Sequence, residues 1–119
     1  MMSRTLLARL AVLGAAAGVT NVFFVQFCDL LYRCGCEALW AGAAMHCNIH
    51  NAAPPHCPWC SGEGALGNWS FGAIIAAQCA LALWPGKFGA IRAGATFLAF
   101  PAVGAIAGVL VGLGTGYWQ

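Results

Sequence analysis

The sequence predicts an all-α membrane protein with three transmembrane helices and a Cys/His-rich loop between the first and second helices. Hydrophobic residues make up 61% of the 119 residues and charged residues only 7%, whereas soluble domains average about 25% charged residues. The apolar residues fall into three long stretches. Six of the seven cysteines and all three histidines lie in one window, 28–60. We therefore expect a single membrane domain covering residues 1–119.

The first predicted helix covers about residues 6–27. Arg4 and Arg9 lie near its start, where the long side chain of Arg9 can extend to the lipid headgroups. A cleaved signal peptide is the alternative interpretation, because the apolar run contains small residues at 15–17. The run nevertheless continues through the apolar residues 22–25, which favours a membrane anchor.

The second predicted helix covers about residues 69–84 and the third about residues 91–117. At ~1.5 Å per residue the second helix spans roughly 24 Å, which is short for a hydrocarbon layer of ~30 Å. It is bracketed by Trp69 and Trp84, and tryptophan is common where a helix meets the membrane surface. Pro101 lies inside the third helix and predicts a kink there.

The basic residues predict how the chain is oriented. Arg4 and Arg9 lie at the start of the first helix, and Lys87 and Arg92 lie around the link between the second and third helices. Three spans put these segments on one side, which should be the cytoplasm because cytoplasmic loops are rich in Lys and Arg. We expect a bacterial inner-membrane protein with a cytoplasmic N-terminus and with the loop 28–68 outside.

Small residues predict close packing of the helices. Glycine recurs at every fourth position of the third helix, at Gly104, Gly108, Gly112 and Gly116. Without a hydrophobic force between helices in lipid, such stripes let backbones approach closely. We expect a tight bundle in which the glycine face also offers a surface to a membrane-protein partner or a second copy. Within the spans, Asn21 and Gln78 are expected to hydrogen-bond between helices.

The loop has the residue types and spacing of a tetrahedral metal site. Cys47 and His50 form one pair of potential ligands, and Cys57 and Cys60 form another. The two-residue gap within each pair lets both side chains reach one ion from a single turn, and thiolate and imidazole suit zinc or iron. We predict a bound metal ion, zinc before iron. The residues available as replacements or for a second site are Cys34, Cys36, His46 and His56.

Two other interpretations of the loop remain open. In an oxidising compartment the six cysteines of the window 28–60 can form disulfides that hold the loop without a metal. Alternatively, Cys57 and Cys60 form a Cys-x-x-Cys pair able to exchange disulfides, with His56 placed to help form a thiolate. No thioredoxin-like strand and helix pattern surrounds that pair.

The sequence therefore predicts a small membrane protein that contacts lipid, with two competing functions. It is either a structural or accessory subunit of a larger membrane complex, or a protein that handles metal ions or exchanges disulfides. The chain has only three acidic residues and no recognisable serine–histidine–acid set, which argues against an enzyme. No carboxylate or histidine lies deep in a predicted span, so a proton relay is not indicated. A net charge of +2 without a basic run argues against nucleic-acid binding.

Overall fold

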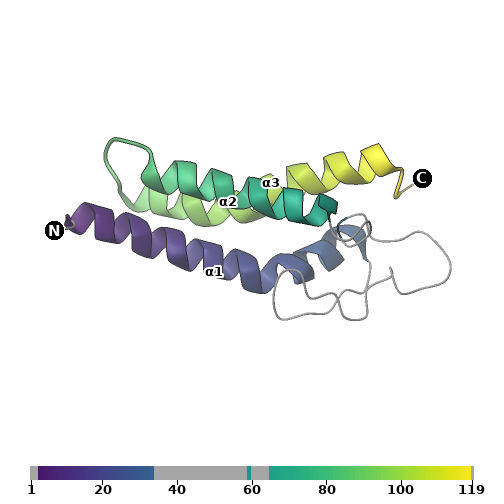
Figure 1. The fold of residues 1–119 in the computed structure, drawn as a ribbon, viewed down its shortest axis with the longest axis horizontal. Helices are drawn as coiled ribbons and strands as arrows, with labels where there is room; N and C mark the ends of the chain where they lie inside the picture. The colour runs from purple at the N-terminus through teal and green to yellow at the C-terminus, as the bar shows by residue number, and fades with distance from the viewer. Residues whose placement is uncertain (1–2, 34–58, 60–64, 119) are drawn as a thin grey trace.

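The computed structural model describes residues 3–33, 59 and 65–118, which form three helices and no strand. The helices are α1 (Arg4–Tyr32), α2 (Ala65–Leu83) and α3 (Ala90–Thr115), and each contacts the other two (Figure 1). The N-terminus and the α2–α3 link lie at one end of the bundle, and the C-terminal end of α3 lies at the other (Figure 1). The predicted all-helical class is confirmed for this part of the chain.

Two helices of the described part are long and apolar enough to cross a membrane. They are α1 over Arg4–Phe24 and α3 over Ala90–Thr115, whereas α2 contains a shorter apolar stretch, Asn68–Leu83. The outer side of α3 exposes large apolar side chains, including Leu98 and Leu110, which are 65% and 62% exposed. This composition is compatible with a membrane protein, while a third span through α2 remains a prediction.

The first helix extends beyond its predicted end at residue 27. Phe24, Cys28 and Tyr32 follow one another at four-residue intervals, and all three side chains are buried in the core. The stripe of residues that faces the core therefore continues for more than a turn into the segment predicted to be loop. Arg33 ends the helix, because its backbone is left-handed (φ 50°). Cys28 consequently belongs to α1 rather than to the loop 28–68.

The other helix boundaries lie close to the predicted ones. The second helix starts at Ala65 instead of near residue 69, and the third is continuous through Pro101, which lies on its exposed side. Gly116 ends α3 in a left-handed conformation (φ 69°). The backbone N–H groups of Gly116 and Tyr117 return to carbonyls of the last helical turn at 3.3 and 2.9 Å, as in a Schellman motif.

A buried polar contact joins α1 to α2 between the two ends of the bundle. Gln78 and Thr20 are both fully buried. The Nε2 of Gln78 donates to the Oγ1 of Thr20 at 2.8 Å, and that hydroxyl donates to the carbonyl of Ala16 at 2.8 Å. The predicted interhelical hydrogen bond of Gln78 is thus confirmed, whereas Asn21 is exposed. A bond of this kind contributes roughly 1 kcal/mol between helices in lipid and fixes their register.

Arg9 of α1 and Arg92 of α3 converge on the C-terminal end of α2. Their guanidinium groups donate to five backbone carbonyls, those of Leu81, Ala82, Trp84, Gly86 and Lys87. They share the Trp84 carbonyl, at 2.5 and 2.6 Å, and both lie over the Phe88 ring, 5.5 and 5.7 Å from its centroid. The last carbonyls of a helix lack intrahelical donors and carry partial negative charge, so two cations satisfy them well. Arg9 therefore binds another helix of the same chain.

Replacing Arg9 with glutamine should destabilise the bundle, because carbonyls at the end of α2 lose a charged donor. Hydrogen bonds to charged groups contribute about 1.5–3 kcal/mol, and we expect the lower part of that range because Arg9 is only half-buried. The measurement is the free energy of unfolding in mild detergent. Arg4→Gln is the matched control, since Arg4 is exposed on the same helix. An equal loss in both variants would mean that only net charge matters.

Candidate functional site at the Trp59 end of the bundle

The residues that the sequence singled out as metal ligands lie outside the described residues. They are Cys47, His50, Cys57 and Cys60, with Cys34, Cys36, His46 and His56 as additional candidates. Among the residues that the structure describes, no group of three or more His, Cys, Asp or Glu side chains is placed to hold a metal ion. The metal prediction is therefore untested, and Trp59 is the described residue nearest in the sequence to the predicted ligands.

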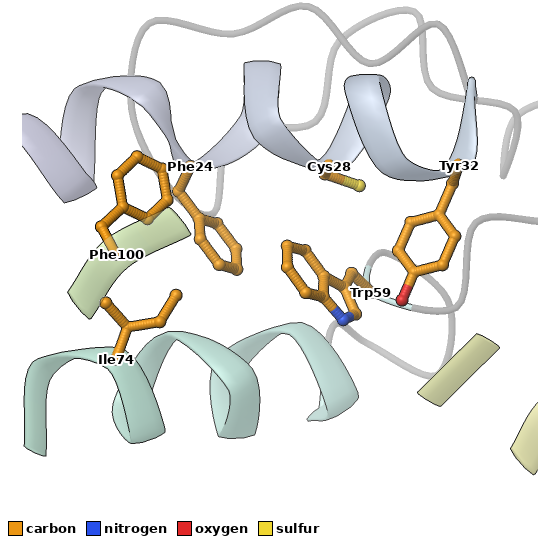
Figure 2. Close-up of a cluster of buried hydrophobic side chains, with 6 residues drawn as sticks. All are labelled: Phe24, Cys28, Tyr32, Trp59, Ile74 and Phe100. Atoms are coloured by element: carbon orange, nitrogen blue, oxygen red, sulfur yellow. The ribbon is translucent and has the colours of Figure 1, made fainter. Parts of the chain in front are cut away.

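Trp59 is the one residue between Cys57 and Cys60 whose position the structure describes. Its side chain is 3% exposed and lies against α1, facing α2 (Figure 2). The indole stacks on the Phe24 ring with centroids 4.7 Å apart and planes 1° apart. The Tyr32 ring meets it edge-on at 5.5 Å. A side chain from the predicted ligand segment is thus packed into the helical core.

Trp59 belongs to an aromatic cluster to which all three helices contribute. The rings of this aromatic cluster are Phe24, Phe27 and Tyr32 of α1, Phe71 of α2, Phe100 of α3, and Trp59, Tyr117 and Trp118. Phe24 meets Phe71 edge-on at 5.3 Å, and Phe27 meets Phe100 at 5.1 Å. Cys28 and Ile74 complete the buried core around them (Figure 2). Aromatic pairs of this kind add about 0.5–1.5 kcal/mol each beyond their burial.

Side chains in and beside the aromatic cluster pack against the glycine face of α3. Gly104, Gly108 and Gly112 are buried, and a Cβ added at Gly104 would lie 2.8 Å from Cε1 of Phe27. A Cβ at Gly108 would overlap the Leu31 side chain, and one at Gly112 would overlap the Trp118 ring. The chain's own side chains therefore occupy the space that these glycines leave. Packing within one chain therefore accounts for the spacing of these glycines. Docking of a partner through the glycine face is untested.

Two tyrosine hydroxyls tie the end of α1 to the end of α3. The Oη of Tyr32 donates to the Gly108 carbonyl at 2.6 Å. The Oη of Tyr117 donates to the Tyr32 carbonyl at 2.7 Å. Because Tyr32 is the last residue of α1, its carbonyl has no intrahelical donor, and Tyr117 supplies one. These bonds fix the point at which the chain leaves α1 for the loop.

The side chains of the aromatic cluster suit a structural role in packing the helices together and not a catalytic role. Within the described residues it brings together rings, aliphatic groups and the Cys28 thiol, with no carboxylate or histidine among its members. The indole Nε1 of Trp59 and the Oγ of Ser70 are buried without a hydrogen-bond partner in the described part. Sequence reasoning missed this cluster, although an apolar tryptophan inside a Cys-x-x-Cys pair was a signal that could have indicated a buried anchor.

Removing the Trp59 side chain should destabilise the whole bundle. Truncating a buried tryptophan to alanine costs about 3–5 kcal/mol, because contacts are lost and a cavity remains. We expect Trp59→Ala to lower the free energy of unfolding by that amount and to remove a blue-shifted component of the tryptophan emission. Trp84→Ala is the matched control, because Trp84 is 69% exposed and should change stability little. Equal effects of the two substitutions would contradict the packing of Trp59.

Glycine-to-alanine substitutions in α3 should have opposite effects at two positions. At Gly104 the new methyl group must displace the Phe27 ring, which itself packs on Phe100, and overpacking costs about 1–3 kcal/mol. At Gly94 nothing lies within 4 Å of the added Cβ, so alanine should stabilise the helix by up to about 1 kcal/mol. Unfolding titrations of both variants in the same detergent test this difference, and a stabilising Gly104→Ala would contradict the close approach.

No family model, curated protein or solved structure matches the chain. The function must therefore be argued from the chain's own residues and their arrangement.

Proposed function

We propose that the chain is a small integral membrane protein whose helices support a metal-binding Cys/His loop. The observation that carries this proposal is the burial of Trp59, the residue that lies between Cys57 and Cys60 in the sequence. Neighbouring Cα atoms are about 3.8 Å apart, so fixing Trp59 restricts the positions that both cysteines can take. A restricted ligand pair loses less conformational entropy when it closes on an ion.

The proposed ligands are Cys47, His50, Cys57 and Cys60, and the proposed metal is zinc, with iron second. Three sulfurs and one imidazole nitrogen form a closed four-ligand set, which is typical of structural zinc rather than catalytic zinc. A structural role also fits the neighbouring aromatic cluster, whose described members include no carboxylate or histidine that could transfer protons.

The proposed membrane arrangement has three spans, with the N-terminus in the cytoplasm and the loop outside. Helix α2 has 19 residues, which at ~1.5 Å per residue approaches the ~30 Å hydrocarbon thickness. It runs antiparallel to α1 and α3 and packs against both, which favours a full crossing (Figure 1). Arg9 and Arg92 meet at the end proposed to be cytoplasmic, and bacterial inner-membrane proteins carry excess basic residues on that side.

Within this arrangement we propose that the protein is a structural or accessory subunit of a larger membrane complex. The exposed apolar surface of α3, which includes Ile106 and Leu110, is available for lipid or for a partner. The buried glycines are not needed for that contact. Exchange of disulfides by Cys57 and Cys60 is the competing role, and the metal content of the purified protein distinguishes the two roles.

Elemental analysis of the detergent-purified protein should find one zinc or iron ion per chain. A Cys57→Ser, Cys60→Ser double variant should lose the ion, because two of the four proposed ligands are removed. Cys79→Ser is the matched control: Cys79 is half-buried on α2, far along the chain from the loop, and its replacement should leave the metal content unchanged.

Counting thiols before and after reduction identifies the alternatives. Metal-free protein whose loop cysteines react only after reduction would mean a disulfide-stapled loop, and the metal proposal would fail. Metal-free protein in which Cys57 and Cys60 alone cycle between thiol and disulfide would instead favour thiol–disulfide exchange.

A further inference from the structure

The end of the bundle formed by the start of α1 and the α2–α3 link concentrates positive charge. Four of the chain's five basic residues lie there, namely Arg4, Arg9, Lys87 and Arg92. The sequence has no Asp or Glu in 1–28 or in 65–119, so none of the helices' own residues at this end neutralises those charges. Such a surface attracts anions.

A groove of about 470 Å³ opens at this end of the molecule. Its lining is mostly apolar and includes Leu81, Trp84 and Pro85, together with the basic residues Lys87 and Arg92. Trp84 is 69% exposed, so its ring is available to a molecule that enters the groove. Lys87 also lines a second hollow of about 640 Å³, beside Phe88.

The two kinds of cation at this groove have different roles. The guanidinium of Arg92 is held by the carbonyls of Leu81 and Trp84 at 2.7 and 2.6 Å, so it contributes charge from a fixed position. Its Nη1 also donates to the Lys87 carbonyl at 3.0 Å, which holds the Lys87 backbone at the rim. Lys87 itself is exposed. An exposed ammonium group on a backbone held in this way, in a groove that is otherwise mostly apolar, can bind a phosphate oxygen directly.

We propose that this groove binds one anionic phospholipid, with its headgroup phosphate at Lys87 and an acyl chain along Leu81 and Trp84. This inference rests on the membrane insertion proposed above. A lining that combines two basic residues with apolar side chains complements a lipid better than a free anion, which would leave the apolar side chains uncovered. Trp84 and Lys87 also have the residue types that anchor a helix end at the headgroup level.

The test uses the full-length protein reconstituted in phosphatidylcholine vesicles that contain a minority of bromine-labelled lipid. Bromine quenches nearby tryptophan, so labelled phosphatidylglycerol should quench more strongly than labelled phosphatidylcholine, and Trp84→Phe should remove most of the difference. Lys87→Gln should weaken the preference for phosphatidylglycerol about fivefold, the effect of one basic residue near an anionic membrane surface. Arg33→Gln is the matched control, because it removes one charge at the opposite end.

The outcomes separate the groove from the membrane proposal on which it rests. Equal quenching by the two labelled lipids would overturn the proposal that the groove binds an anionic phospholipid. A preference for phosphatidylglycerol that Lys87→Gln leaves unchanged would overturn it as well. In both cases the proposed membrane insertion would stand. If inorganic phosphate abolishes the preference for phosphatidylglycerol and Trp84→Phe has no effect, the groove binds a free anion and the lipid proposal is wrong. A protein that is extracted from every vesicle by alkaline carbonate overturns the membrane proposal itself.

Discussion

The insertion of the Trp59 indole beside α1 is the contact that organises the end of the bundle where α1 and α3 finish. The indole covers Phe24 face to face and meets Tyr32 edge-on, so the last two turns of α1 have a core to face. Without this cover, the end of α1 would keep only its contacts with the end of α3, where Tyr117 and Trp118 pack against Tyr32. The glycines of α3 serve the same contact, because a side chain at Gly108 would compete with Leu31 for space beside the indole.

The two ends of the bundle are held by different physical interactions. At one end, arginine guanidinium groups neutralise the partial negative charge of the α2 carbonyls, an electrostatic contact that salt and headgroups can modulate. At the other end, aromatic rings pack together, and the hydroxyls of Tyr32 and Tyr117 donate to the carbonyls of Gly108 and Tyr32. This division suits a chain with few charges, since Arg9, Arg92 and Tyr117 each donate to carbonyls at or just beyond a helix end.

The sequence predicted the positions of the helices well and the contacts between their side chains poorly. Long apolar runs identify α1 and α3 without knowledge of their neighbours, and Gln78 stood out as a polar residue inside an apolar helix. The end of α1 was misplaced because Cys28 and Tyr32 become core residues only when Trp59, distant in the chain, covers them. Arg9 was expected to reach lipid headgroups, since its carbonyl partners exist only where α2 ends beside it. The metal ligands remain a prediction from spacing.

The position of Trp59 couples the loop to the helices in both directions. An ion that draws Cys57 and Cys60 together favours the backbone geometry that keeps the indole in the core, and the packed indole favours the geometry that the ion requires. Such coupling is reciprocal in free energy, so loss of metal would loosen the aromatic cluster and loss of the cluster would weaken metal binding. The same argument holds if the two cysteines form a disulfide, with bond formation in place of ion binding. In either case the buried side chain of Trp59 would connect the state of Cys57 and Cys60 to the helices.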